Sequence, residues 1–499
     1  MQGIPTITAR TWPSSAGRAR ELLRPVGLAL AILAIELVLA HSATSPQLPK
    51  LVLLFFGVFI VALILRFPFA TALVLIGLTD SVFGDSFFAH QVGPVTVRPY
   101  ELALFCLLAL SVLRPVKRTW GGSTGAALAI FLALVVVSAA IAVSAGRAEL
   151  TEAFNWARPL ALLTIFYVVI RLFPEPEQQR SLLLGAAVIA AATGAIALLA
   201  FLGAGFTHSL QESGEQAIRS EEGLGSLSRV RLPGLGAGYA LFWYAAVQIM
   251  SRRGRQRLLW SGLLLGIGVD ILVSFNRNMW VGIVVGLFLM TILGGPFVRN
   301  RIAGSVAMVV AGLVAVIVFS SSASSDQVIA PVLRRGETIL NPSKTAGENS
   351  LQDRAKETRI AWKTARENPL LGVGAGASFG VISKHPVTSG SIFVGVATEP
   401  QLFLHNQYIY LILIAGVPGL IAFLWFLLSS VAFALRRSPR DLAILACGVG
   451  ITLIMISSVV AIYFTVENMT TMLGLLCGVI VTDRVRLASG QASSGLLPE

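Results

Sequence analysis

The chain of 499 residues is rich in apolar side chains and poor in charges: 55% of its residues are hydrophobic, 13% are charged, and its mean hydropathy is +0.79. A soluble globular domain carries about 25% charged residues, so this composition excludes the soluble classes. Apolar runs of about 18 or more residues recur from end to end, which is typical of membrane-spanning helices. The net charge of +13 does not indicate nucleic acid as a partner, because no DNA- or RNA-binding pattern accompanies it.

In chain order, the apolar runs predict about fourteen crossings, so we expect an all-α integral membrane protein built as a bundle of about 12–14 transmembrane helices. The crossings are expected at residues 26–41, 51–66, 67–83, 99–113, 125–144, 158–173, 181–203, 234–250, 258–274, 278–295, 302–321, 402–435, 441–463 and 467–482. The first run follows three arginines and has the layout of a signal peptide. Glu36 within it and the many later spans favour an uncleaved first helix.

Clusters of basic residues in the short loops predict the orientation. They all lie on one side if the N-terminus is cytoplasmic, as the positive-inside rule requires. The clusters are at residues 114–118, 252–255, 299–301, 436–437 and 484–486. We therefore expect one transmembrane domain over residues 1–499, with both termini cytoplasmic and the loops at 204–233 and 322–401 facing outward. The sequence has no internal repeat, which argues against the repeat-built folds of many transporters.

Four arginines stand at the outer ends of different predicted helices. Arg98, Arg158 and Arg231 each lie at the start of a span, and Arg277 lies in a short turn, S-F-N-R-N-M-W, between two apolar helices. A planar guanidinium suits bidentate contact with phosphate oxygens. Taken one at a time, each arginine is better explained by contact with lipid headgroups. Their number favours a shared anionic pocket.

The large outer loop contains one segment with helical periodicity, residues 351–366. Arg354 lies on the flank of its apolar face, so we expect it to have a partner: either a carboxylate such as Asp353 or Glu357, or a substrate phosphate. The following N-P-L-L-G-V-G-A-G at 368–376 ends the helix at its proline, and its glycines allow tight turns or close backbone approach. It lacks the lysine and the serine or threonine of a nucleotide-binding loop, so it does not indicate ATP binding.

His405 and Asn406 lie where the polar loop runs into an apolar helix, in L-F-L-H-N-Q-Y. At a helix N-terminus the macrodipole disfavours imidazolium, which leaves a neutral ring able to accept a proton from a sugar hydroxyl. The alternative is a structural histidine bonded to a loop carbonyl. The remaining histidines have no comparable setting: they are His41, His90, His208 and His385.

No metal site is predicted. The sequence has no H-x-x-x-H, no D-x-D and no cluster of outward carboxylates. Cys106, Cys447 and Cys477 lie inside apolar runs, without the spacing of a metal site. If a phosphate leaving group is to be stabilised, arginines must do it.

Together these motifs resemble the superfamily of bacterial O-antigen ligases and O-antigen polymerases, membrane glycosyltransferases that share a Wzy-type C-terminal region. The resemblance rests on S-F-N-R-N-M-W around Arg277, on Arg354 fifteen residues before Pro369, on N-P-L-L-G-V-G at 368–374, and on H-N-Q-Y and G-V-P-G-L within 405–420. It covers about residues 260–425, while the N-terminal half matches only in hydropathy and in R-L-P-G at 231–234. The N-R-N around Arg277 departs slightly from the pattern, in which small residues often surround the arginine.

The resemblance implies a GT-C-like bundle in the bacterial inner (cytoplasmic) membrane. It implies an undecaprenyl-pyrophosphate-linked glycan as donor, used on the outer face without nucleotide, metal or other cofactor. Arg277 and Arg354 would hold the pyrophosphate, with Arg231 and Arg158 as auxiliary donor-binding residues. His405 would activate the acceptor hydroxyl as the catalytic base. Asn406 would orient the acceptor or the histidine, and the outer loop would close over the sugar and exclude water.

The sequence leaves two readings of the enzyme open, because ligases and polymerases share all these motifs. The acceptor is then either lipid A-core or another hydroxyl compound, or a second lipid-linked glycan. A different class, a transporter or flippase of lipid-linked or anionic saccharides, predicts charges near the middle of spans. Glu36 and Asp270 are the main carboxylates inside the predicted spans, whereas the arginines cluster at one interface. That distribution favours an enzyme acting at one surface.

Overall fold

The computed structural model divides into two units, Met1–Arg66 and Phe67–Glu499. It describes residues 62, 65–80, 90–92, 95–114, 120–201, 235–274, 276–301, 349–383, 398–400, 402, 404–438 and 440–490. In the first unit the described residues, 62, 65 and 66, are helical. All the elements named below belong to the second unit.

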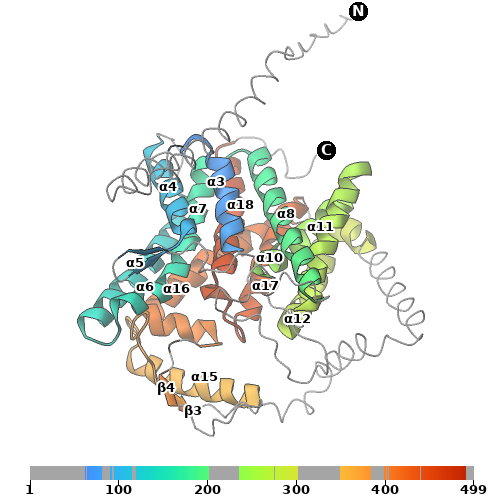
Figure 1. Ribbon diagram of the computed structural model, residues 1–499. Helices are drawn as coiled ribbons and strands as arrows, with labels where there is room; N and C mark the ends of the chain where they lie inside the picture. The colour runs from blue at the N-terminus through green and yellow to red at the C-terminus, as the bar shows by residue number, and fades with distance from the viewer. Residues whose placement is uncertain are drawn as a thin grey trace, which may run out of the picture. The chain divides into compact units, whose positions relative to one another are not determined.

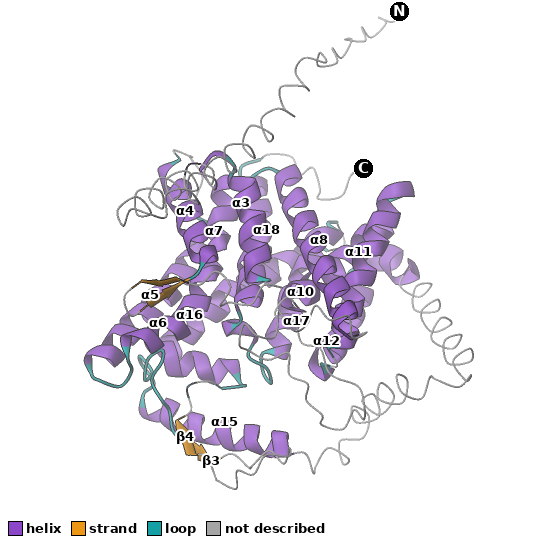
Figure 2. Ribbon diagram, in the orientation of Figure 1, coloured by secondary structure: helices purple, strands orange, loops and turns teal. Residues whose placement is uncertain are grey.

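The second unit is helical, with two short hairpins on its connections (Figure 2). Its helices are α3 (Pro68–Thr79), α4 (Pro99–Leu113), α5 (Gly122–Ser144), α6 (Leu150–Ala161), η1 (Leu162–Thr164), α7 (Ile165–Leu172), α8 (Pro176–Phe201), α10 (Leu235–Ser251), α11 (Gly254–Val273), α12 (Arg277–Leu293), α15 (Asn349–Glu367), α16 (Gln407–Arg437), α17 (Leu442–Ser457), η3 (Tyr463–Thr465) and α18 (Glu467–Ala488). The antiparallel hairpins pair β1 (His90–Val92) with β2 (Val95–Val97) and β3 (Val381–Ser383) with β4 (Thr398–Pro400). The apolar periodicity gave no indication of these three-residue strands.

The helices confirm an all-α membrane protein. Among the described residues, five helical stretches are long and apolar enough to cross a bilayer, with mean hydropathies between 1.4 and 2.9. They are Gly122–Ser144, Leu150–Leu172, Pro176–Leu199, Gly254–Val273 and Gln407–Arg437. Each coincides with a predicted crossing. The total of 12–14 stays a prediction, because the expected spans at 26–41 and 302–321 and most of 51–66 lie outside the described residues.

Close packing of small and aromatic side chains holds the bundle together. In a bilayer, helices associate through such contacts, because lipid tails are as apolar as leucine. A Cβ on Gly282 would lie 1.7 Å from the Tyr239 hydroxyl oxygen, so the tyrosine side chain of α10 lies against the backbone of α12 in space that the glycine leaves. The rings of Phe131 and Phe423 lie 4.9 Å apart, and those of Phe423 and Phe464 4.8 Å apart, which joins α5, α16 and η3.

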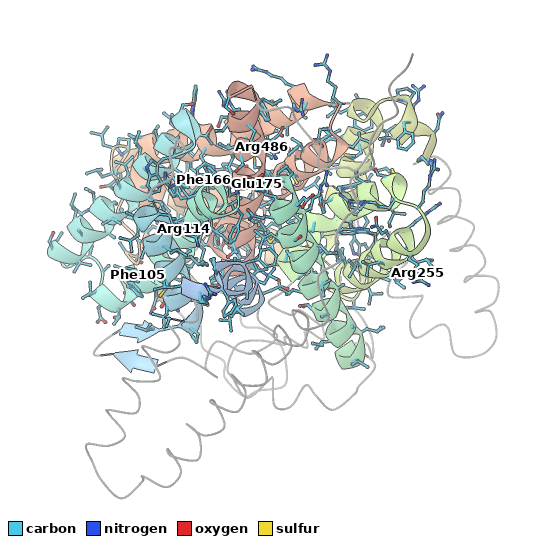
Figure 3. The ribbon with its side chains drawn as sticks, turned by 90° about the horizontal axis from the view of Figure 1, so that it is seen from above. Phe105, Arg114, Phe166, Glu175, Arg255 and Arg486 are labelled. Atoms are coloured by element: carbon cyan, nitrogen blue, oxygen red, sulfur yellow. The ribbon has the colours of Figure 1, made fainter. Side chains whose placement is uncertain are left out.

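The bundle has two different ends. Helix α15 lies across the lower end in Figure 1, crosswise to upright helices such as α3 and α18. The opposite end carries Arg114, Arg255 and Arg486, which are spread over the ends of three helices when that end is viewed from above (Figure 3). Basic residues therefore mark the end of the bundle away from α15.

Helix α16 is broken in its first half, and the loop after α15 fills the break. Gly416 has φ 70° and ψ 178°, and Pro418 follows it. The regular bond between the Leu413 carbonyl and the Val417 N–H is therefore lost. The Leu413 oxygen instead accepts from Val373 N at 2.7 Å and Gly374 N at 3.1 Å. Val417 N donates to the carbonyl of Pro369 at 2.8 Å. Residues 369–374 therefore supply hydrogen-bond partners both for the Leu413 carbonyl and for the Val417 N–H.

We call the contact between residues 369–374 and 413–417 the joint. It explains why the motifs N-P-L-L-G-V-G at 368–374 and G-V-P-G-L at 416–420 occur in the same chain. The glycines were expected to allow tight turns or close backbone approach, and two N–H groups of the loop, those of Val373 and Gly374, donate to the Leu413 carbonyl. A Cβ at Gly416 would lie 2.0 Å from the Leu370 oxygen. Ser138 of α5 also donates to the Leu371 oxygen, at 2.5 Å. The C-terminal end of α15 is thus fixed to the membrane bundle.

We expect Gly416→Ala to destabilise the protein strongly. Left-handed backbone costs a residue with a Cβ about 1–3 kcal/mol, and the collision with Leu370 adds to this. Gly146→Ala is the matched control, because Gly146 has φ +67° with nothing within 4 Å of its Cβ position, so it tests backbone strain alone. Thermal unfolding of both variants in detergent should show the larger drop in Tm for Gly416→Ala. Equal drops would mean that the joint contributes little beyond the strained backbone.

Candidate active site

The histidine expected at the helix start has a buried carboxylate as its partner. His405 Nδ1 lies 2.8 Å from Glu357 Oε2, and the two residues are 48 positions apart in the sequence. The Glu357 side chain is 8% exposed and that of His405 is 28% exposed. A carboxylate and a histidine on separate elements, α15 and the start of α16, therefore form a dyad with its imidazole open to solvent.

The dyad fixes the tautomer of His405. A carboxylate only accepts hydrogen bonds, so the neutral ring donates from Nδ1 and keeps its lone pair on Nε2. A base needs that lone pair. When Nε2 takes a proton, the nearby carboxylate stabilises the imidazolium, which is the role of the acid in Ser-His-Asp triads. The geometry therefore suits a histidine that removes a proton from a hydroxyl group.

Asn406 caps the helix that follows the histidine. Its side-chain oxygen accepts from Ile409 N at 3.3 Å, the usual arrangement of an N-cap asparagine. Gln407 N donates to the Ser458 carbonyl at 3.0 Å and so ties the same turn to the segment after α17. These bonds hold the backbone at His405. A direct contact of Asn406 with the acceptor stays a prediction.

Arg354 lies three residues before Glu357 on α15, one turn away along the helix. It is half-buried, and its Nη1 donates to the Val460 carbonyl at 3.3 Å. The sequence offered Glu357 as a partner for Arg354, but the hydrogen bond of Glu357 in the structure is to His405. A cation and the glutamate of the dyad thus occur within one turn of the same helix.

Arg277 is the first residue of α12, directly after the N-cap residue Asn276. Asn276 Oδ1 accepts from Asn278 N at 3.2 Å, and its Nδ2 donates to the Tyr463 hydroxyl at 2.9 Å. The N–H groups of Asn278, Met279 and Trp280 all donate to Asn276, so they are already bound. The positive end of the helix dipole still favours an anion, and Arg277 adds a guanidinium there.

The remaining predicted arginines have less direct support. Arg158 is in the last turn of α6, which begins at Leu150, so it does not start the span as expected. The helix already begins at Leu150 because residues 150–157 are helical and amphipathic, whereas the predicted span contained only the apolar run that starts at residue 158. Arg158 Nη1 lies 3.9 Å from Glu101 Oε1, and Arg98 Nη1 lies 2.8 Å from Glu467 Oε1. Arg231 lies outside the described residues.

Two residues of the site were missed as site residues in the sequence. Glu357 had been considered only as a partner of Arg354, and its signal was an acidic residue on the packed side of an amphipathic helix. Tyr463 had no signal, because it ends the predicted crossing at 441–463, where a tyrosine is typical of the membrane interface. Within the described part of the chain, no group of three or more histidine, cysteine or acidic residues could hold a metal ion.

One protein family matches part of the chain. Residues 262–424 match the family model described as O-antigen ligase, and they make up about a third of the sequence. Arg277, the dyad of Glu357 and His405, and the joint at Gly416 all lie inside the matched residues, which confirms the resemblance seen in the motifs. No curated protein matches the chain. This similarity supports a membrane enzyme of the O-antigen ligase or polymerase type.

We expect Glu357→Gln to reduce the rate of glycan transfer about 10²-fold or more, because general-base catalysis contributes roughly 10²- to 10⁴-fold and an amide neither fixes the tautomer nor stabilises imidazolium. Initial rates with saturating substrates measure the effect. Glu367→Gln is the matched control, since Glu367 ends the same helix and is exposed. A Glu357→Gln enzyme as active as this control would show that the dyad is structural.

Proposed function

We propose that the protein transfers a glycan from an undecaprenyl-pyrophosphate-linked donor to an acceptor hydroxyl on the outer face of the bacterial inner membrane. The observation that carries the proposal is the dyad of His405 and Glu357, with Arg354 one turn away, inside the O-antigen ligase region. A base can activate a hydroxyl group, and a nearby cation can stabilise a phosphate leaving group.

In the proposed reaction, His405 Nε2 takes the proton of the acceptor hydroxyl. The acceptor oxygen forms a bond to the anomeric carbon, and the bond from that carbon to the pyrophosphate oxygen breaks. Polyprenyl pyrophosphate leaves with the electron pair, and its added negative charge is offset by Arg277 and Arg354. Stabilising charge that develops in the transition state is often the largest single contribution to catalysis. Neither nucleotide nor metal takes part in these steps.

The topology we propose places the site at the outer face, with both termini cytoplasmic. The basic residues at the end of the bundle away from α15 support it, because short cytoplasmic loops collect arginine and lysine. A lipid-linked pyrophosphate would then lie at the membrane surface, beside the N-terminus of α12 and on the side of α15 that faces the bundle. The expected closure of the outer loop has to leave residues 369–374 in place, since the joint fixes them to α16.

The test is a reconstitution in liposomes with a labelled polyprenyl-pyrophosphate glycan, without nucleotide and with EDTA present. Longer lipid-linked chains identify a polymerase. Release of polyprenyl pyrophosphate only after lipid A-core or another acceptor is added identifies a ligase. Movement of label across the bilayer without turnover would replace the proposal by a transporter, and His405 would then be structural.

We expect His405→Ala, Arg277→Ala and Arg354→Ala each to abolish transfer in this assay while the protein still inserts in the membrane. Arg255→Ala is the matched control. Arg255 is exposed at the opposite end of the bundle (Figure 3), and its substitution removes the same charge. Near-normal transfer by His405→Ala would remove its role as base. Equal loss of transfer in the Arg255→Ala control would mean that total charge matters more than these positions.

A further inference from the structure

The segment that joins α17 to α18, residues 458–466, contacts each element that carries a proposed site residue. Arg354 of α15 donates to the Val460 carbonyl at 3.3 Å, and Gln407 N, two residues after His405, donates to the Ser458 carbonyl at 3.0 Å. Asn276, directly before Arg277, donates to the Tyr463 hydroxyl at 2.9 Å. Three elements distant in the sequence therefore meet on one short segment, which we call the α17–α18 connection.

The α17–α18 connection is rigidly held. Phe464 is 0% exposed, and its ring packs edge-on against Tyr408 at 5.4 Å and against Phe423 at 4.8 Å. Thr465 donates to the Gln407 side-chain oxygen at 3.2 Å. At its end, Glu467 pairs with Arg98 at 2.8 Å. A segment fixed in this way can hold other elements in place.

Tyr463 acts on the turn that presents Arg277. The side chain of Asn276 has two ends: its oxygen caps α12 through Asn278 N, and its nitrogen is held by the Tyr463 hydroxyl. The amide therefore has one orientation, and the backbone that leads into Arg277 is fixed by it. Tyr463 is 7% exposed, so it is placed to hold this turn rather than to react with a glycan itself.

We infer that Tyr463 is a positioning residue for the pyrophosphate site, and that the α17–α18 connection sets the distance between Arg277 and the dyad of His405 and Glu357. The inference rests on the proposed function, since it takes Arg277 to bind the donor pyrophosphate. The α17–α18 connection lies beyond residues 262–424, so the active site extends past the region that matches the family.

Tyr463→Phe tests the inference, because it removes the hydroxyl and leaves the ring packing. We expect KM for the lipid-linked donor to rise about three- to tenfold, the effect of losing one hydrogen bond. KM for the acceptor and the pH dependence of the rate should stay as in the wild type, since the dyad is untouched. Asn276→Ser should behave alike: serine still caps α12 but cannot reach Tyr463.

Tyr408→Phe is the matched control. The Tyr408 hydroxyl donates to the Met455 carbonyl at 2.7 Å, near the start of the α17–α18 connection, and has no bond to the turn at Arg277. Its loss should leave KM for the donor unchanged. An equal rise of donor KM in Tyr408→Phe and Tyr463→Phe, with equal drops in Tm, would overturn the inference, because both hydroxyls would then serve only stability.

A double-mutant cycle with Arg277→Lys shows whether Tyr463 acts through Arg277. Residues that act through one another give effects that do not combine independently, so the donor KM of the double variant should be lower than the product of the single effects predicts. Independent effects of the two substitutions, or a wild-type donor KM in Tyr463→Phe, would overturn the inference. The proposed function would still stand in that case if Arg277→Ala is inactive. An active Arg277→Ala enzyme would remove both the inference and the proposed role of Arg277, whereas absence of transfer by the wild-type protein would remove the proposed function.

Discussion

The broken hydrogen bond between Leu413 and Val417 is the constraint on which the candidate site depends. Inside a bilayer, backbone N–H and C=O groups without partners cost several kcal/mol each, so a helix can be broken only where other protein groups replace the lost bonds. Residues 369–374 supply them. The same residues follow α15 directly, and this fixes α15 over the start of α16, where Glu357 meets His405. A backbone requirement within α16 thus places a side-chain dyad at its start.

The two ends of the bundle use charge differently. Away from α15, charges are paired within the protein: Asp483 is 1% exposed and contacts both Arg437 and Arg486, and Arg171 donates to the carbonyls of Ser111 and Arg114. At the α15 end, Arg98 and Arg158 also have carboxylate neighbours. Of the two arginines that we propose for the donor, Arg354 donates to the Val460 carbonyl and Arg277 is the first residue of α12.

Local features of the sequence predicted the membrane class, the spans and the positions of Arg277, Arg354 and His405. Each of these follows from a nearby pattern, such as an apolar run or a lone polar residue at its end. The pairing of His405 with Glu357 could not be predicted, because it depends on how residues 368–377 fold against α16. The start of α6 was misplaced for a related reason: an amphipathic turn at the membrane surface lacks the continuous apolar run that marks a span. Tyr463 has no local signal of any kind.

The dependence of the site on the α17–α18 connection has a consequence for how the protein is assembled. The joint at Gly416 links segments about forty residues apart, so it can close soon after α16 enters the membrane. Tyr463 and Glu467 are synthesised later. Arg98 can pair with Glu467 only after the 369 positions between them have been synthesised. If Tyr463 positions Arg277 as we infer, a ribosome that has finished residues 262–424 has made the region that matches the family but not the segment that orders the site. Helices α17 and α18 then complete the site, so chains that stop before residue 463 should turn over the proposed lipid-linked donor poorly.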